Sequence, residues 1–323
     1  MRSKRALFTM LVALWYLAGC GAPGGSQRVL HIGMILARGG LGDRSFNDSA
    51  YSGLQEAQKQ LGVRFDTLDF TTDEANLEGL RRFAREKYDL IIGVGFENGP
   101  TIQTVAAEFP EQRFAVIDTT ADGANVASVV YREPEGDFVM GALAAMLTKT
   151  GQVGFIGGVD LPVIRRIEAG FRQGVAYQDA TVTVRADLAG TFTDAAVGQR
   201  LAAAQYAAGV DVIYNAAGRT GLGVIDAAKT ARKLTIGTSG DQRYLAPGFV
   251  VGNRQKRLDT AVLGLIAEVQ QASFAPGVRS LGLREQGLTV GPFDETLVTA
   301  EMRSRLEDLQ ARIIAGEIVV GAQ

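Results

Sequence analysis

Residues 151–177 read GQVGFIGGVDLPVIRRIEAGFRQGVAY and contain a short apolar run, a glycine-rich turn and an amphipathic stretch. The run at 152–158 is continuously apolar rather than alternating, which is typical of a strand covered on both faces of a parallel sheet. Apolar residues then recur at helical spacing from Ile164 to Tyr177. The stretch therefore predicts a strand, a turn and a helix, which is the repeating unit of an α/β fold.

The same unit recurs on either side of this stretch. Comparable apolar runs lie at 29–36, 89–95, 114–118, 211–218 and 234–240, and comparable helical patterns lie at 50–61, 76–87, 195–208 and 221–232. Strands that alternate with helices in this way indicate parallel sheets with helices on both faces.

Two interruptions divide the alternation into two lobes. At 126–136 a short strand leads through Glu133-Pro134-Glu135-Gly136 into an apolar helix, and at 244–254 the chain passes through Pro247-Gly248. Roughly 300 residues also suit two domains better than one. We therefore expect a discontinuous first lobe (28–130 plus 255–323), a second lobe (131–254), and hinge crossings near 126–136, 244–254 and 285–295.

The N-terminus predicts export and a lipid anchor. Arg2, Lys4 and Arg5 precede an apolar stretch, 6–17, that is too short to span a bilayer. The following Leu-Ala-Gly-Cys resembles the bacterial lipobox, so we expect a signal peptide over 1–19, lipidation of Cys20 and a tether over 20–27. The protein would then sit on the extracytoplasmic face of the cell membrane; an ordinary secretory signal with a chance cysteine is the alternative.

Composition argues against several functions. The chain has 33 basic and 35 acidic residues without a basic cluster, so nucleic acid is not an expected partner. One cysteine and one histidine, His31 inside the first apolar run, cannot make a zinc site. The run 218-GRTGLG lacks the Lys and Ser/Thr of a phosphate loop, and no nucleophile has an evident base partner. We expect no metal, no cofactor and no enzymatic activity.

Polar side chains are concentrated in the turns that follow the strands, where open parallel sheets bind ligands. These turns are 43-DRSFND, 93-GVGFENG, 118-DTTADG, 157-GGVDLP, 190-GTFTD, 215-NAAGRTG and 239-SGDQ. They offer aromatic rings, hydroxyls, amides and carboxylates but little positive charge. This inventory predicts a neutral, polar ligand that carries a flat ring.

Individual residues of these turns fit such a ligand. Phe46 and Phe96 can stack on a ring, and Asn47 can donate to and accept from a base edge. Asp118 and Asp241 can accept hydrogen bonds from sugar hydroxyls.

A structural interpretation of the first turn is equally open. Asp43 or Ser45 can cap a helix that begins at Asn47, and Phe46 can serve as a hydrophobic staple.

Over essentially the whole mature length, the sequence resembles the basic membrane lipoprotein family, whose studied members bind purine nucleosides and serve ABC importers. The matching segments are 43-DRSFND, 135-EGDFVMGALAAML, 151-GQVGFIGGVDLPVIRRIEAGF, 192-FTDAAVGQ, 211-DVIYNAAGRTGLGV, 241-DQRYLAPG and 253-NRQKRLDTAV. The resemblance implies a type I periplasmic-binding-protein fold, in which a monomer clamps a nucleoside between two lobes and delivers it to an ABC permease.

The resemblance also implies roles by position. Phe46 would stack on the base, and Asn47 would bond to the base edge or the ribose. The other positions are Gly95 and Phe96 in the first-lobe wall, Asp118 at a strand end, Gly218 where the ligand approaches the backbone of the second lobe, and Asp241 and Lys256 near the ribose.

Three departures from the family pattern leave the ligand open. Ile167 stands where relatives commonly have an aromatic residue, Ser239 replaces a carboxylate, and Arg219 replaces a common glycine beside the cleft. The alternatives are therefore another small polar ligand, such as a sugar, or a ligand-sensing surface lipoprotein that works without a transporter.

Overall fold

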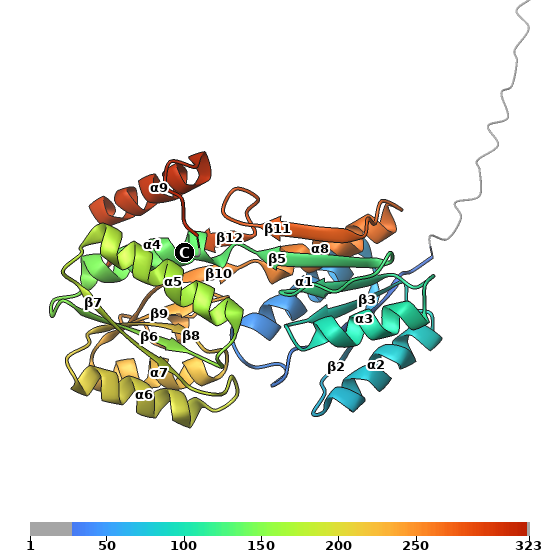
Figure 1. The fold of residues 1–323 in the computed structure, drawn as a ribbon, viewed down its shortest axis with the longest axis horizontal. Coiled ribbons are helices and arrows are strands. Elements are labelled where there is room, and N and C mark those ends of the chain that lie inside the picture. The colour runs from blue at the N-terminus through green and yellow to red at the C-terminus, as the bar shows by residue number, and fades with distance from the viewer. Residues whose placement is uncertain (1–27, 322–323) are drawn as a thin grey trace, which may run out of the picture.

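The computed structural model describes residues 28–321, which form two lobes joined by extended crossings (Figure 1). The predicted signal peptide, Cys20 and the tether lie outside the described residues. Each lobe is built on one six-stranded sheet, and the two sheets have corresponding strand orders. The predicted two-lobed α/β architecture is therefore confirmed.

Lobe 1 contains the sheet β11-β5-β4-β3-β1-β2, in which every neighbouring pair is parallel. Its strands are β1 (His31–Ile35), β2 (Arg64–Leu68), β3 (Leu90–Val94), β4 (Phe114–Ile117), β5 (Val126–Tyr131) and β11 (Gly277–Leu281). Helices α1 (Phe46–Leu61) and α8 (Leu258–Gln270) pack together on one face, and α2 (Asp73–Arg85) and α3 (Asn98–Glu108) on the other.

Lobe 2 contains the sheet β12-β10-β9-β8-β6-β7. Its strands are β6 (Gln152–Gly157), β7 (Thr183–Leu188), β8 (Val212–Ala216), β9 (Leu234–Thr238), β10 (Val250–Lys256) and β12 (Leu288–Val290). Helices α4 (Glu133–Leu147) and α5 (Pro162–Gln178) pack together, as do α6 (Ala195–Ala207) and α7 (Thr220–Ala231), and the short 3-10 helix η1 (Arg243–Leu245) precedes β10. The sheet is parallel except at β12, which pairs antiparallel with β10.

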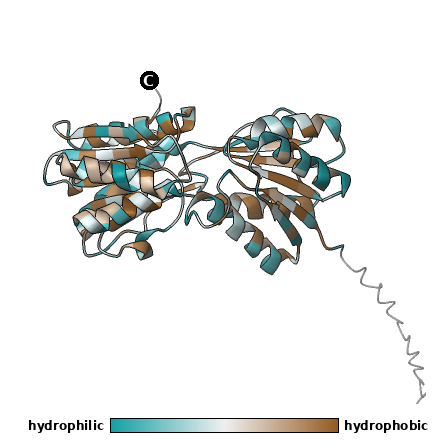
Figure 2. Ribbon diagram, turned by 90° about the horizontal axis from the view of Figure 1, so that it is seen from below, coloured by the Kyte–Doolittle hydropathy of each residue, from teal (hydrophilic) through white to brown (hydrophobic). Residues whose placement is uncertain are grey.

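Continuous apolar strands bury both of their faces, as the sequence predicts. In β3, Leu90 and Ile92 point toward α1 and α8, whereas Ile91 points toward α2 and α3. Figure 2 shows the same pattern as apolar strands inside each lobe. Within residues 28–321, no helix combines the length and apolar character that a membrane crossing requires.

The second hinge crossing differs from the expected position. The stretch 244–254 is not a crossing, because 250–256 forms β10 and pairs with β9 and β12 inside lobe 2. The chain crosses at 131–133 between β5 and α4, at 256–258 between β10 and α8, and at 281–288 between β11 and β12. The apolar run at 249–251 is thus a buried strand rather than a connection.

The C-terminal segment also departs from the expected lobe boundary. We expected 255–323 to complete lobe 1, but β12 joins the second sheet and α9 (Ala300–Ala315) packs on α4. The side chain of Gln173 in α5 donates to the carbonyl oxygen of Val319 at 3.1 Å. The cause is apolar complementarity, since α9 buries Leu306, Leu309 and Ile313, and α4 is apolar along most of its length.

Glycines allow α4 and α5 to approach closely. A Cβ placed on Gly174 would lie 1.8 Å from the carbonyl oxygen of Phe138, and one on Gly141 would lie 2.0 Å from that of Phe171. No side chain fits at either position without moving one helix away from the other.

Candidate functional site

A cavity of about 110 Å³ lies between the two lobes, at the carboxyl ends of the strands. Loops after β1, β3 and β4 supply the lobe 1 wall, and α5 with the loops after β7, β8 and β9 and the end of β10 supplies the lobe 2 wall. The predicted residues that line it are Phe46, Asn47, Gly95, Phe96, Asp118, Ile167, Gly218, Ser239 and Lys256. The topology thus brings together turns that lie more than 200 residues apart in sequence.

Asp241 is the predicted site residue that does not line this cavity. Its carboxylate accepts hydrogen bonds from the Arg243 guanidinium at 3.0 and 2.9 Å and from the Asn253 amide at 3.1 Å. Ser239, two residues before Asp241, adopts a left-handed backbone conformation with φ of 63°. The side chain of Asp241 therefore stabilises the turn after β9 instead of facing the ligand space.

Asn47 lines the cavity, but its amide is already engaged with lobe 1 backbone. Its Oδ1 accepts from the Ala37 N–H at 2.9 Å, and its Nδ2 donates to the carbonyl oxygens of Ala37 and Gly40 at 3.2 and 3.0 Å. Both amide hydrogens have partners, so in this conformation Asn47 holds the loop after β1 in shape and has only spare acceptor capacity.

The capping alternative for the first turn is half correct. Asp43 is buried, and its carboxylate accepts from the backbone N–H groups of Ser45, Asn47 and Asp48 at 2.9, 2.8 and 3.2 Å, so it caps α1. Ser45 does not cap the helix, because its hydroxyl donates to the carbonyl oxygen of Thr238 in lobe 2 at 2.9 Å. The Phe46 ring faces the cavity, with Lys256 Nζ 5.6 Å from its centroid.

Three charged residues meet at the hinge end of the cavity. Lys256 at the end of β10 donates to Asp118, after β4, and to Glu133 Oε1 at 3.0 Å, at the start of α4. Burial alone would lower the pKa of Lys256, but the two carboxylates raise it above its usual value. Asp118 also adopts a left-handed conformation, with φ of 77°. The cluster ties lobe 1 to two of the crossings and gives this end of the cavity a cationic donor and carboxylate acceptors.

A second buried ion pair lies beside it. Arg254 Nε donates to Asp137 Oδ1 at 2.8 Å, and the Tyr214 hydroxyl donates to the same oxygen at 2.5 Å. Burial raises the pKa of Asp137 to about 6, although the charge of Arg254 acts in the opposite direction. Arg254 Nη1 and Asp137 Oδ2 have no hydrogen-bond partner among the described residues, and Arg254 lines the cavity.

The wall contributed by α5 is aliphatic. Leu161, Val163, Ile164 and Ile167 line the cavity here, so position 167, where relatives commonly have an aromatic residue, presents an aliphatic side chain to the cavity. Phe192, in the loop after β7, lines the same side of the cavity.

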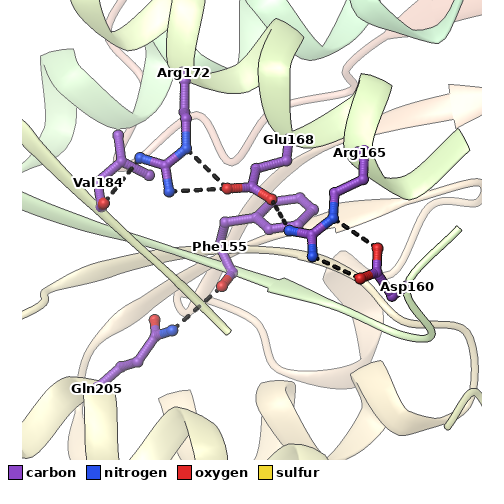
Figure 3. Close-up of polar contacts among 7 residues, drawn as sticks. All are labelled: Phe155, Asp160, Arg165, Glu168, Arg172, Val184 and Gln205. Carbon is purple, nitrogen blue, oxygen red and sulfur yellow. Dashed lines mark hydrogen bonds and ion pairs between the residues drawn. The ribbon is translucent and has the colours of Figure 1, made fainter. Parts of the chain in front are cut away.

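A ladder of ion pairs runs along α5 beside its aliphatic side chains (Figure 3). Arg165 donates to both oxygens of Asp160 at 2.7 and 2.8 Å and to Glu168 at 3.2 Å. Arg172 donates to Glu168 at 2.8 Å and to the carbonyl oxygen of Val184 in β7 at 3.0 Å. The ladder links α5 to the loop that precedes it and to β7.

Direct hydrogen bonds cross the cleft on the side of α1. Arg219 Nη2 donates to the carbonyl oxygens of Gly39 and Leu41 at 2.9 and 2.6 Å, and Gln242 Nε2 donates to that of Arg44 at 3.3 Å. Together with the Ser45 bond described above, these contacts join the loop after β1 to lobe 2. The structure is therefore a closed arrangement of the two lobes.

The cavity continues into a groove of about 1110 Å³ on the side of α3 and α5. Phe96, Asp118, Leu161 and Val163 line both spaces. The two spaces therefore adjoin one another at these four residues.

Among the cavity residues that were not predicted as site residues are Glu97 and Phe192. Both lie in turns at the ends of strands that the sequence predicts to be polar. The sequence therefore predicts that these turns lie near the site, but it does not predict which of their side chains face the cavity.

The predicted site glycines Gly95 and Gly218 have φ of 94° and 55°. Backbone geometry alone therefore favours glycine at both positions.

Comparisons with known proteins place this chain in a family. Residues 31–323 match the model of the Bmp family, described as ABC transporter substrate-binding protein PnrA-like. The nucleoside-binding protein BmpA of an ABC transporter from Lactococcus lactis is 30% identical, over 98% of this chain and 99% of the relative. The CD4+ T-cell-stimulating antigen of Listeria monocytogenes is 32% identical over 91% and 89% of the two chains.

A solved structure agrees with these relatives. The solute-binding protein of an ABC transporter system from Aeropyrum pernix K1 superimposes with a TM-score of 0.84 at 28% identity, covering 91% of this chain and 94% of that one. Fold and cavity together define a substrate-binding protein of the type I periplasmic-binding-protein class. The chain belongs to the Bmp family of PnrA-like ABC transporter substrate-binding proteins, which bind solutes and are not enzymes.

Proposed function

We propose that this protein captures a nucleoside in the interlobe cavity and delivers it to the permease of an ABC importer. The observation that carries the proposal is the composition of the cavity. An aromatic ring, Phe46, and an aliphatic wall with Ile167 suit a flat base, and the Lys256 and Asp118 cluster suits ribose hydroxyls, which both donate and accept.

Two independent features support this assignment. The relative from Lactococcus lactis, similar over almost the whole of both chains, is named a nucleoside-binding protein. The cavity is also far larger than the roughly 10–15 Å³ that one water needs, and its walls come from both lobes, so a ligand there contacts both at once.

Lobe closure is the proposed mechanism. A ligand that touches both walls binds the closed form more tightly than an open one and shifts the population by that difference in affinity. The closed form would be the one that the permease recognises.

Titration calorimetry of the purified protein with adenosine, guanosine, inosine and cytidine tests the ligand class. We expect saturable heat with at least one nucleoside and no competition by ribose alone. No heat with any nucleoside at millimolar concentration would overturn the proposal.

The Phe46→Ala variant should weaken the binding of that nucleoside by about 1–3 kcal/mol, as expected for the loss of one stacking partner. Tyr244→Ala is the matched control, because Tyr244 is 61% exposed and lies outside the cavity. If Phe46→Ala and Tyr244→Ala bind the nucleoside with equal affinity, Phe46 does not contact the ligand.

A sugar is the second candidate ligand. The observation that favours it is the aliphatic Ile167, since a ligand without a base needs no second ring. Saturable heat with a free pentose or hexose, undiminished in Phe46→Ala, would favour this candidate over a nucleoside.

We further propose that Cys20 carries the lipid anchor, on the strength of the Leu-Ala-Gly-Cys segment and of similarity to relatives named lipoproteins. Expression of the full chain in a bacterial host with labelled fatty acid, followed by membrane fractionation, tests this. We expect label in the membrane fraction and its loss in Cys20→Ser; an unlabelled wild-type chain would contradict the anchor.

A further inference from the structure

Glu97 lines the cavity and has one carboxylate oxygen without a hydrogen-bond partner among the described residues. The residue follows Phe96 at the end of β3 and directly precedes α3, and it lines the space between the lobes. Its Oε2 atom is buried and has no hydrogen-bond partner within the described part of the chain. This feature was not anticipated from the sequence, and the proposed function alone does not explain it.

The position of the carboxylate is fixed by the loops beneath it. A Cβ placed on Gly95 would lie 3.0 Å from Glu97 Oε2 and 2.8 Å from the Ala37 Cβ, so the carboxylate lies against the backbone of the loops after β3 and β1. The charged groups around it are Arg38, after β1, and Asp73, at the start of α2. Burial raises the pKa of Glu97 above its usual value, and the nearby backbone N–H groups of Glu97 and Arg38, together with the charge of Arg38, oppose this rise.

An unsatisfied buried carboxylate oxygen is costly, and a ligand can remove the cost. Leaving a buried acceptor unpaired costs about 1–3 kcal/mol, and more when the group is charged. An ionised carboxylate only accepts hydrogen bonds, so the missing partner is a donor. A ligand that presents an N–H or O–H at this point would complete the site.

The strand order indicates which end of a nucleoside supplies that donor. Asp118 follows β4 and Lys256 ends β10, and both strands lie toward the crossings in their sheets. Glu97 follows β3 and leans toward the β1 loop, on the side of lobe 1 away from the crossings. A ribose that bonds to Asp118 and Lys256 therefore leaves the base to extend past Phe46 toward Glu97.

We propose that Glu97 is a specificity-determining residue that accepts a hydrogen bond from an exocyclic amino group of the base. The protein then selects amino-bearing nucleosides over analogues of the same shape that lack the amino group. This inference rests on the proposed function and names the part of the ligand that Glu97 recognises.

Two matched pairs of ligands test the inference: adenosine against purine riboside, which lacks the 6-amino group, and guanosine against inosine, which lacks the 2-amino group. We expect the wild-type protein to bind the amino-bearing member of at least one pair more tightly by about 10- to 100-fold, the range for a hydrogen bond to a charged group. Equal affinities within both pairs would overturn the inference.

The variant Glu97→Met removes the acceptor at nearly constant length. It should bring the affinity ratio of the selective pair close to one, chiefly by weakening the amino-bearing ligand. Glu111→Met is the matched control, because Glu111 is an exposed carboxylate of the same lobe outside the cavity. Glu97→Gln, which keeps an acceptor oxygen and the shape of the side chain, should retain part of the ratio.

The outcomes separate this inference from the proposed function. If Glu97→Met keeps the wild-type ratio, or weakens both members of a pair equally, Glu97 does not read the amino group. If neither member of either pair binds to the wild-type protein, the proposed nucleoside-binding function is wrong, and the inference about Glu97, which rests on it, is wrong as well. Should Glu97→Met not fold, as judged by its thermal transition, Glu97→Gln decides: an affinity ratio below the wild-type value supports the inference, and a ratio equal to the wild-type value overturns it.

Discussion

Arg219 Nη2 lies 2.6 Å from the carbonyl oxygen of Leu41, so a side chain of lobe 2 is bonded directly to a loop of lobe 1. The same atom lies 2.9 Å from the carbonyl oxygen of Gly39. Neither bond involves a ligand, so the contact stabilises the closed form before anything is bound. Such a contact raises the fraction of the protein that is in the closed, binding-competent form. The apparent ligand affinity is then closer to the intrinsic affinity of that form.

Removal of this contact should open the protein. In Arg219→Ala, we expect a larger radius of gyration by small-angle X-ray scattering without ligand, and an apparent ligand affinity weaker by about 3- to 10-fold, in line with the loss of one or two hydrogen bonds. Arg200→Ala removes the same charge from an exposed position on α6 and should change neither quantity. An unchanged radius in Arg219→Ala would show that the contact does not hold the lobes together.

The buried pair of Arg254 and Asp137 should matter for stability. Their side chains are 1% and 0% exposed, so Asp137→Ala leaves an uncompensated buried guanidinium and should lower the free energy of unfolding by about 3–5 kcal/mol. Asp160→Ala breaks the exposed pair with Arg165 and should cost at most about 1 kcal/mol. Urea denaturation of both variants measures the difference, and equal losses would contradict this view of the hinge.

The close approach of α4 and α5 gives a prediction about glycine. Gly174→Ala should lower the free energy of unfolding by about 1–3 kcal/mol or more, because its methyl group would overlap the Phe138 carbonyl oxygen. Gly264→Ala, in α8, meets no atom within 4 Å and should be stabilising by up to about 1 kcal/mol through helix propensity. Thermal unfolding of the two variants should therefore shift in opposite directions.

Ligand binding should depend on pH through Glu97. Its pKa is raised from the ordinary value of 4.5, chiefly by burial, and the charged groups that face it are Arg38 and Asp73. As the pH falls through this raised pKa, Glu97 gains a proton and loses acceptor capacity, so the affinity for an amino-bearing nucleoside should fall in mildly acidic solution. Calorimetry from pH 7 down to the ordinary glutamate pKa of 4.5 should show this loss in the wild-type protein and not in Glu97→Met, and a flat wild-type profile over this range would contradict it.

The central strands could be predicted from sequence, whereas the edge strands could not. Strands β3, β4, β6, β8 and β9 fall within continuous apolar runs, because both of their faces are covered. Strands β2, β7, β11 and β12 lie at the edges of the sheets, where one side is open and the sequence is mixed. Such strands carry no continuous apolar signal.

The position of site residues was easier to predict than the role of each side chain. Parallel strands bring their carboxyl ends to one edge, so Phe46, Asp118 and Ser239 meet at the cavity as expected. The local turn decides where a polar side chain points, and this separates Asp241, bonded to Arg243, from Glu97, which faces the cavity. The role of Asn47 was likewise not predictable, because its side-chain amide is hydrogen-bonded to the backbone of its own lobe.

Each lobe takes its last elements from the C-terminal part of the chain. Lobe 1 requires β11 at 277–281, and lobe 2 requires β12 at 288–290 and α9 at 300–315. A nascent chain that stops short of these segments leaves β5 and β10 with exposed edges, which are aggregation-prone in partly folded proteins. Lobe 1 therefore gains its last strand only after residue 281 has been made, when most of lobe 2 has already been synthesised, and lobe 2 gains its last helix only after residue 315 has been made.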